Sequence, residues 1–341
     1  MDYEVLYITV DKGGFMLKKI DFSIKRVFPK NNRRYPTCID DIIYSISSWI
    51  NKDFELMYWD SWEFKYDKES NKENLMNIFN AITINNIYKS LFRYHKTDIK
   101  MHVNDDVNQL YDLIENQIHL GTPTIIGLDG YYNEWDTFFF HKEHNAHACV
   151  VTGIDRVKRS LMISDCYFDK KDKLISFDLV NQATHFFGRV IFIEEPKYTK
   201  QEAIIMVKDL FLAINCDQFE SMRRFANDIQ NSADYGEAQT SEVAQLSSIY
   251  DGLNQVILGR LRFAYMLNYI KTKYGIAELD KIGDKFYRSA LNWEITLNIL
   301  AKSLLMDNFF KKVDKVADKI YLAAAFEENL LEECQTLFLA S

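Results

Sequence analysis

A histidine and an aspartate stand at opposite ends of two neighbouring apolar segments within the stretch HACVVTGIDRVKRSLMISD. His147 precedes the apolar residues 148–151, a turn is predicted over 153–160, and the second apolar segment ends at Asp165. A hairpin of this form places the imidazole beside the carboxylate. In acyl-transfer enzymes such a carboxylate orients the imidazole, which in turn activates a cysteine or serine. The pair therefore predicts a nucleophile elsewhere in the chain.

Cys38 is the predicted nucleophile. Apolar residues recur at spacings of three and four over 39–50, which predicts a helix that begins at or next to Cys38. Unpaired backbone N–H groups and the helix dipole stabilise a thiolate at such a position, and a neighbouring imidazolium adds to this. Asp40 and Asp41 in the first turn oppose it. We expect direct contact with His147 to outweigh them.

Other cysteines and histidines near the hairpin are interpreted as structural. Cys149 and Cys166 are competing nucleophiles, but each is expected in a strand and lacks helix N–H groups, so both are interpreted as packing residues. His141 and His144 precede His147 at spacings of three. Because no cysteine or carboxylate cluster accompanies them, we expect a polar loop and no metal site. The five cysteines are scattered without CxxC pairs, which indicates reduced thiols.

The segment before Cys38 offers groups for substrate binding. The backbone N–H of Cys38 and the side chain of Asn32 are the expected oxyanion donors, with Asn31 an equal candidate for the second and a plain loop role as the alternative. Lys30, Arg33 and Arg34 belong to a basic run over 25–34. We expect this run near the entrance to Cys38. A solvated loop is the alternative.

Two domains are predicted, divided at Pro196. Residues 1–195 combine a short N-terminal hairpin, helices and strands, among them helices over 73–95 and 105–119 and the hairpin 147–166. Residues 196–341 carry helical spacing almost throughout. The helices expected there are 199–215, 217–231, 238–274, 277–306 and 308–338. The fold class is therefore α+β followed by an all-α helical domain.

Charge and hydropathy restrict the partners. The net charge is −8 and basic residues are not dense enough for a phosphate-tracking surface, so we expect no nucleic acid partner. The N-terminus is acidic and no apolar run has the length of a membrane span, so we expect no membrane partner and a cytoplasmic location. No bound cofactor is indicated by any motif.

Several segments resemble a known family. TPTIIGLDGYY, HACVVTGID and LMISDCY look like the C39-like papain superfamily, specifically the N-terminal domain of the butirosin-biosynthesis BtrH family. PTCIDDIIYSISSWI is similar to its nucleophile helix, and GRLRFAYMLNYI with FYRSALNWEITLNILAKSLL to its helical region. The resemblance implies a papain-like cysteine protease fold and the catalytic set Cys38, His147 and Asp165.

The resemblance also implies a reaction. It indicates an acyltransferase that moves an acyl chain from a carrier-protein thioester to an amine, forming an amide in antibiotic or other natural-product assembly, as in closthioamide assembly. With such a substrate, Lys30, Arg33 and Arg34 would bind an acidic carrier protein or its phosphopantetheine phosphate. Two alternatives stay open. One is a cysteine peptidase that uses the same residues, and the other is an inactive papain-like module that only binds a carrier or metabolite.

Overall fold

The computed structural model divides into two compact units. The structure describes residues 7–9, 16–28, 37–66, 82–83, 87–103, 107–184, 186–194, 196–231, 248–305 and 311–339. The first, here the sheet unit, comprises Met1–Phe54 and Leu91–Glu195, and the second, here the helical unit, comprises Glu55–Ser90 and Pro196–Ser341. The predicted boundary at Pro196 coincides with one junction. The segment 55–90 differs from the predicted division, because it groups with the helices.

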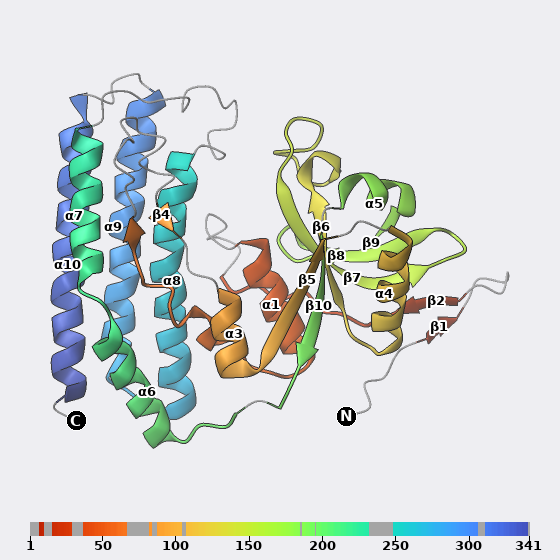
Figure 1. Cartoon of the computed structure of the whole chain (residues 1–341), viewed down its shortest axis with the longest axis horizontal. Helices are drawn as coiled ribbons and strands as arrows, with labels where there is room; N and C mark the ends of the chain where they lie inside the picture. Colours follow the sequence, from red (N-terminus) through yellow and green to blue (C-terminus); the bar gives the residue numbers. More distant parts are fainter. Residues whose placement is uncertain are drawn as a thin grey trace. The chain divides into compact units, whose positions relative to one another are not determined.

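An antiparallel sheet forms the centre of the sheet unit (Figure 1). Its main path runs in the order β1-β2-β7-β6-β10-β5, and β8 pairs with β7 and β9 to complete eight strands. The strands are β1 (Tyr7–Thr9), β2 (Met16–Lys19), β5 (Thr97–Val103), β6 (Thr124–Asp129), β7 (Ala146–Asp155), β8 (Ser160–Asp165), β9 (Lys170–Ser176) and β10 (Phe186–Phe192). The predicted N-terminal hairpin corresponds to β1 and β2, and the hairpin 147–166 to β7 and β8.

Helices cover both faces of this sheet. Ile126, Cys149 and Val151 face a core completed by α4 (Val107–His119) and α5 (Phe177–Ala183). Alternate residues such as Ala148 and Val150 face a second core, completed by α1 (Cys38–Trp49). Side chains alternate between the faces of a strand, so β7 contributes to both cores and is buried along nearly its whole length. This rigid strand carries His147.

The first turn of α1 begins at Cys38, as predicted. Thr37 is the N-cap and forms a capping box with Asp40: the Asp40 N–H donates to Thr37 Oγ1 at 3.4 Å, and the Thr37 N–H donates to Asp40 Oδ2 at 3.1 Å. Such a box satisfies backbone donors that a helix start leaves unpaired. It fixes where the helix begins and thereby where Cys38 lies.

The helical unit is built on long helices that pack side by side. They are α6 (Lys200–Ala213), α7 (Asp217–Gln230), α8 (Ser248–Tyr274), α9 (Leu279–Leu305) and α10 (Val313–Leu339). The short elements η2 (Glu55–Tyr58), β3 (Lys65–Tyr66) and β4 (Ile82–Thr83) accompany them. A side chain at Gly259 of α8 would collide with the Ser61 carbonyl oxygen, which shows how closely the segment after η2 approaches that helix.

Glu327 lies at the centre of the helical unit. It is fully buried and accepts hydrogen bonds from Arg260, Ser289, Trp293 and Trp62. Burial opposes its ionisation, but the charge and hydrogen bonds of Arg260, with those of Ser289 and Trp293, lower the pKa of the carboxyl below its ordinary value. Trp62 comes from the segment 55–66, so this contact holds that segment within the helical unit.

The α+β sheet followed by helices is confirmed, and a papain-like fold stays a prediction. The helix expected over 73–95 is wrong at Ile82–Thr83, which forms β4 with β-branched residues that favour strands, whereas α3 (Ile87–His95) is helical. The remaining parts of that prediction, 73–81 and 84–86, lie outside the described residues. The strands β5 and β9 were not predicted. The sequence of β5, TDIKMHV, does alternate between apolar or β-branched and polar residues, which is a strand signal that the prediction did not use, whereas that of β9, KKDKLIS, does not. In the part of the chain that the structure describes, no helix is long and apolar enough to span a membrane.

Candidate active site

His147 and Asp165 form a buried ion pair where strand β7 begins and strand β8 ends. His147 is the second residue of β7, Asp165 is the last residue of β8, and the two strands pair antiparallel. The distance from His147 Nε2 to Asp165 Oδ2 is 2.8 Å. Their side chains are 6% and 0% exposed. The hairpin thus brings the predicted imidazole and carboxylate together.

Asp165 is held ionised by several donors. Besides His147, Oδ2 accepts from Trp135 Nε1 at 2.7 Å, and Oδ1 accepts from the Phe168 N–H at 3.0 Å. Burial opposes ionisation, but the hydrogen bond and charge of His147, with the Phe168 N–H and Trp135, lower the pKa of Asp165 below its ordinary value. The carboxylate is therefore fixed in position and in charge.

His147 is poised to carry a positive charge. Burial opposes that charge, but Cys149, the hydrogen bond to Asp165 and Cys38 raise the pKa of His147 well above its ordinary value. Burial raises the pKa of Cys149 to about 12, against the opposing effect of His147, so this thiol stays protonated at neutral pH. Asp165 is then the charged partner of the imidazolium.

Cys38 is among the side chains that raise the pKa of His147, which indicates that its thiol lies near the imidazole. It is half-buried, whereas Cys149 is fully buried. Because Asp165 takes Nε2, Nδ1 is the ring nitrogen available to a thiol. The structure therefore pairs His147 with Asp165 and places Cys38, at the start of α1, near the imidazole. Their catalytic role stays a prediction.

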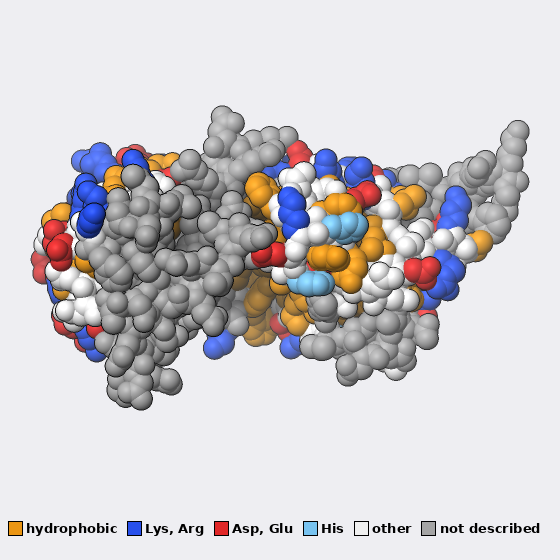
Figure 2. Space-filling view, turned by 90° about the horizontal axis from the view of Figure 1, so that it is seen from above, with side chains coloured by type: hydrophobic (Ala, Val, Ile, Leu, Met, Phe, Trp, Pro, Cys, Tyr) orange, Lys and Arg blue, Asp and Glu red, His pale blue; other side chains and the backbone are white. Residues whose placement is uncertain are grey.

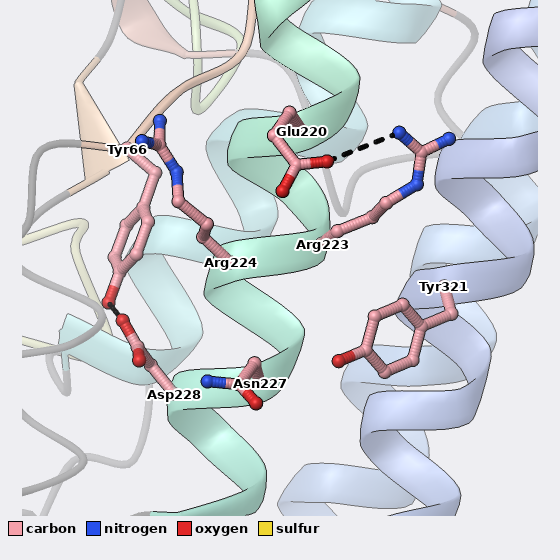
Figure 3. Close-up of a pocket in the computed structure, with 7 residues that line it drawn as sticks. All are labelled: Tyr66, Glu220, Arg223, Arg224, Asn227, Asp228 and Tyr321. Carbon is pink, nitrogen blue, oxygen red and sulfur yellow. Dashed lines mark hydrogen bonds and ion pairs between the residues drawn. The ribbon is translucent and has the colours of Figure 1, made fainter.

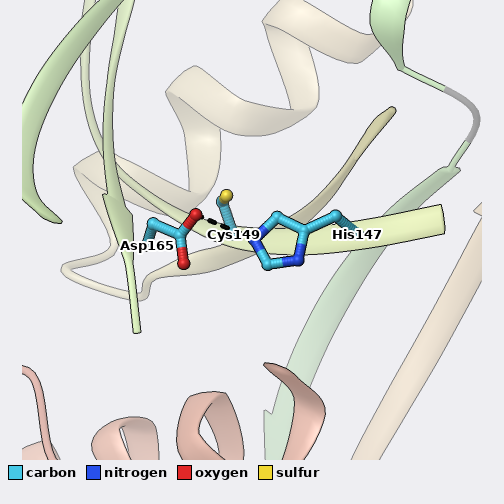
Figure 4. Close-up of side chains that lie close together, drawn as sticks. All are labelled: His147, Cys149 and Asp165. Atoms are coloured by element: carbon cyan, nitrogen blue, oxygen red, sulfur yellow. Dashed lines mark hydrogen bonds and ion pairs between the residues drawn. The ribbon is translucent and has the colours of Figure 1, made fainter. Parts of the chain in front are cut away.

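Cys149 lies closer to His147 and Asp165 than its interpretation as a packing residue suggests. It is two residues after His147 on β7, so both side chains lie on the same side of the strand, and the two are shown with Asp165 in Figure 4. The ligand atoms of His147, Cys149 and Asp165 lie within 4.8 Å of one another, close enough for a metal ion. However, His147 and Asp165 already bond each other, and all three side chains are buried.

Asp41 lies on the same helix, one turn after Cys38, and is fully buried. Burial raises its pKa to about 7, the N–H of Val27 and the charge of Arg26 oppose this rise, and Asp40 and Asp165 add to it. The Val27 N–H donates to Asp41 Oδ1 at 3.0 Å. The carboxyl is therefore only partly ionised at neutral pH, which weakens its expected opposition to a Cys38 thiolate.

The predicted oxyanion and carrier-binding residues cannot be placed. Asn32, its alternative Asn31, and Lys30, Arg33 and Arg34 all lie outside the described residues. The backbone N–H of Cys38 stands at the start of α1, where the helix leaves such groups without helical partners. This position suits an oxyanion donor.

A cavity of about 750 Å³ lies in the helical unit (Figure 3). Its polar lining includes Arg223 and Arg224 but also Glu220 and Asp228, and the Tyr66 hydroxyl donates to Asp228 Oδ2 at 2.7 Å. Arg223 pairs with Glu220 at 3.5 Å. Opposite charges therefore balance around this cavity, and none of the predicted catalytic residues lines it.

Sequence reasoning did not find Trp135. This residue lies in the loop between β6 and β7, thirty positions before the carboxylate to which it donates. Loops carry no periodic signal, so nothing in the sequence pattern indicated the contact. The proximity of Cys149 to His147, in contrast, follows from the two-residue alternation of the strand.

Comparison with known proteins supports the resemblance over part of the chain. Comparison with curated proteins gave no significant match. The narrower identification with closthioamide assembly has no support. Residues 52–166, about a third of the chain, match the family model described as butirosin biosynthesis protein H, N-terminal. The matched range includes His147 and Asp165 and begins after Cys38. This segment is thus similar to the N-terminal domain of a protein of butirosin antibiotic biosynthesis.

Proposed function

We propose that the protein is a cysteine-dependent acyltransferase that moves an acyl chain from a carrier-protein thioester to an amine, with Cys38 as nucleophile and a papain-like arrangement of the site. The observation that carries the proposal is the buried hydrogen-bonded pair of His147 and Asp165, with Cys38 at the start of α1 among the side chains that act on the imidazole. The matched family model favours a biosynthetic enzyme, since it is named for a biosynthetic protein.

The first half-reaction forms an acyl-enzyme. Before the attack the proton of Cys38 rests on His147 Nδ1, as a thiolate–imidazolium pair. The thiolate sulfur then attacks the thioester carbonyl carbon. The Cys38 N–H, together with Asn32 or Asn31, stabilises the oxyanion. The carbonyl re-forms, the bond to the carrier thiol breaks, and His147 returns the proton to the departing sulfur. Asp165 keeps the imidazole in place and stabilises its charge during these steps.

The second half-reaction forms the amide. The nitrogen of a primary amine attacks the acyl carbon, the C–N bond forms and the C–S bond to Cys38 breaks. His147 takes the proton of the nitrogen and delivers it to the Cys38 sulfur. No bound cofactor is required, because the acyl chain arrives on the phosphopantetheine of the carrier. Lys30, Arg33 and Arg34 are proposed to bind that carrier through its acidic surface or phosphate.

Incubation with an acyl-carrier thioester and a diamine tests the proposal. We expect an amide product from the wild-type protein and none from Cys38→Ala. Cys216→Ala is the matched control, because Cys216 is an exposed thiol in the other unit. Peptide cleavage without amide formation would instead support a cysteine peptidase. Binding of carrier or amine with no turnover would support the inactive module.

A further inference from the structure

A second imidazole–carboxylate pair lies where β6 passes into the loop that leads to β7. His144 Nδ1 is 2.6 Å from Asp129 Oδ2. The side chain of Asp129 is 5% exposed, whereas that of His144 is 68% exposed. The pair formed by His147 and Asp165 is buried, but this second pair presents its imidazole to solvent.

The surroundings of Asp129 fix the orientation of His144. Asp129 Oδ1 accepts the N–H groups of Tyr131 at 3.0 Å and Asn145 at 3.1 Å. Burial opposes ionisation, but His144 and these two N–H groups lower the pKa of Asp129 below its ordinary value. A carboxylate at Nδ1 leaves Nε2 as the nitrogen that accepts a proton. The Tyr131 ring stacks on His144, with centroids 4.6 Å apart and planes 20° apart.

This pair lies at the same end of the sheet as the candidate active site. In the β6–β7 register, Asp129 faces Ala146 and Leu128 faces His147. His144 precedes His147 by three residues, so their Cα atoms are at most about 11 Å apart. The same loop supplies Trp135 to Asp165. Figure 2 shows histidine side chains among hydrophobic ones on the surface of the sheet unit.

Amide formation needs a proton acceptor that exchanges with solvent. An alkylamine is an ammonium ion at neutral pH and must lose one proton before it attacks and a second after the C–N bond forms. His147 can deliver the second proton to the Cys38 sulfur, so that His147 and Cys38 together hold as many protons as before acylation. The first proton must leave the protein. His147 must be neutral to take the second proton and its side chain is only 6% exposed, so it cannot also hold the first proton and pass it directly to water.

We propose that His144, oriented by Asp129 and Tyr131, is the base that takes the first proton from the acceptor ammonium and releases it to water. The proposal rests on the proposed function and assigns the amine half-reaction its own catalytic residue. The substrate class that follows is a primary alkylamine, which the exposed imidazole and the adjoining aromatic ring receive at the surface. Asp129 is a positioning residue in this scheme.

The test separates the two half-reactions. The wild-type protein and His144→Gln are acylated with an acyl N-acetylcysteamine thioester, and intact mass follows both the gain of the adduct and its loss on addition of a diamine. We expect the variant to form the adduct at the wild-type rate but to lose it to the diamine about 100-fold more slowly. Hydroxylamine, which is neutral at neutral pH, should remove the adduct equally fast from both proteins.

His141→Asn is the matched control, because His141 is an exposed histidine of the same loop and asparagine tolerates its backbone φ of 54°. It should behave as wild type throughout. Loss of the adduct to the diamine at the wild-type rate in His144→Gln would overturn the role of His144. Equal slowing with hydroxylamine would also overturn it, because the effect would not depend on deprotonation. Failure of the wild-type protein to form any adduct would refute the proposed function itself.

Discussion

At the scale of residues, the chemistry of the site depends on the carboxylate of Asp165, which its hydrogen-bond donors keep ionised. Asp165 accepts from His147, Trp135 and the Phe168 N–H, and this set keeps it ionised inside the protein. The sequence predicted His147 and Asp165 because His147 precedes one apolar segment and Asp165 ends the next. It did not predict Trp135, since the contact depends on how an aperiodic loop folds back across the sheet.

Removal of the carboxylate charge should change the pH dependence of acylation. The pKa of His147 is raised, so the imidazolium persists at neutral pH and is lost as the pH rises through that pKa. In Asp165→Asn we expect the alkaline limb of the acylation rate to move to lower pH, measured as adduct formation against pH. Asp155→Asn, at the other end of β7, should leave the limb in place. An unmoved limb in Asp165→Asn would contradict the role of this carboxylate.

At the scale of elements, the start of α1 determines where the nucleophile lies. Apolar spacing and the acidic first turn predicted this helix start from the sequence, and the capping box of Thr37 and Asp40 is its structural cause. The face that α1 buries against Ala148 and Val150 keeps the helix on the strand that carries His147. The same packing of α1 against β7 therefore sets the position of Cys38 and keeps it near His147.

Loss of the cap should affect both stability and acylation. Thr37→Val removes the hydroxyl, and we expect the free energy of unfolding to fall by about 1 kcal/mol and the acylation rate to fall with it. Thr37→Ser should retain both. Thr199→Val removes the corresponding cap of α6 and should lower stability without slowing acylation. If both valine variants slow acylation equally, the cap of α1 has no specific effect on Cys38. Denaturant unfolding and adduct formation measure the two quantities.

At the scale of the whole molecule, helical spacing predicted the described helices α6 to α10, because long amphipathic helices leave the clearest pattern in a sequence. The predicted starts at 238 and 308 lie outside the described residues. The same reasoning could not assign the segment 55–90. Its attachment to the helical unit depends on single contacts, such as Trp62 Nε1 to Glu327 Oε2 at 2.8 Å, which join residues far apart in the chain.

Glu327 should be the most sensitive polar position of the helical unit. Glu327→Gln leaves Arg260 buried without its carboxylate, so we expect the free energy of unfolding to fall by about 3 kcal/mol. Glu328→Gln changes the neighbouring residue, which forms a partly exposed pair with Arg223, and should alter this free energy by less than about 0.5 kcal/mol.

The pH dependence of stability gives a second readout for Glu327. Its pKa is lowered in the folded state, so its contribution is present above the ordinary glutamate pKa and is lost as the pH falls through the folded-state value. The difference in unfolding free energy between wild type and Glu327→Gln should therefore shrink under acid. A difference that is the same at acid and neutral pH would contradict an ionised Glu327.

The most direct measurement of the central claim is intact mass after incubation with an acyl thioester, followed by peptide mapping of the adduct. The account predicts one acyl group per protein, attached to Cys38, removed by an amine with release of the amide, and absent in Cys38→Ala. An adduct on Cys149, or an adduct that persists at the wild-type level in Cys38→Ala, would contradict it.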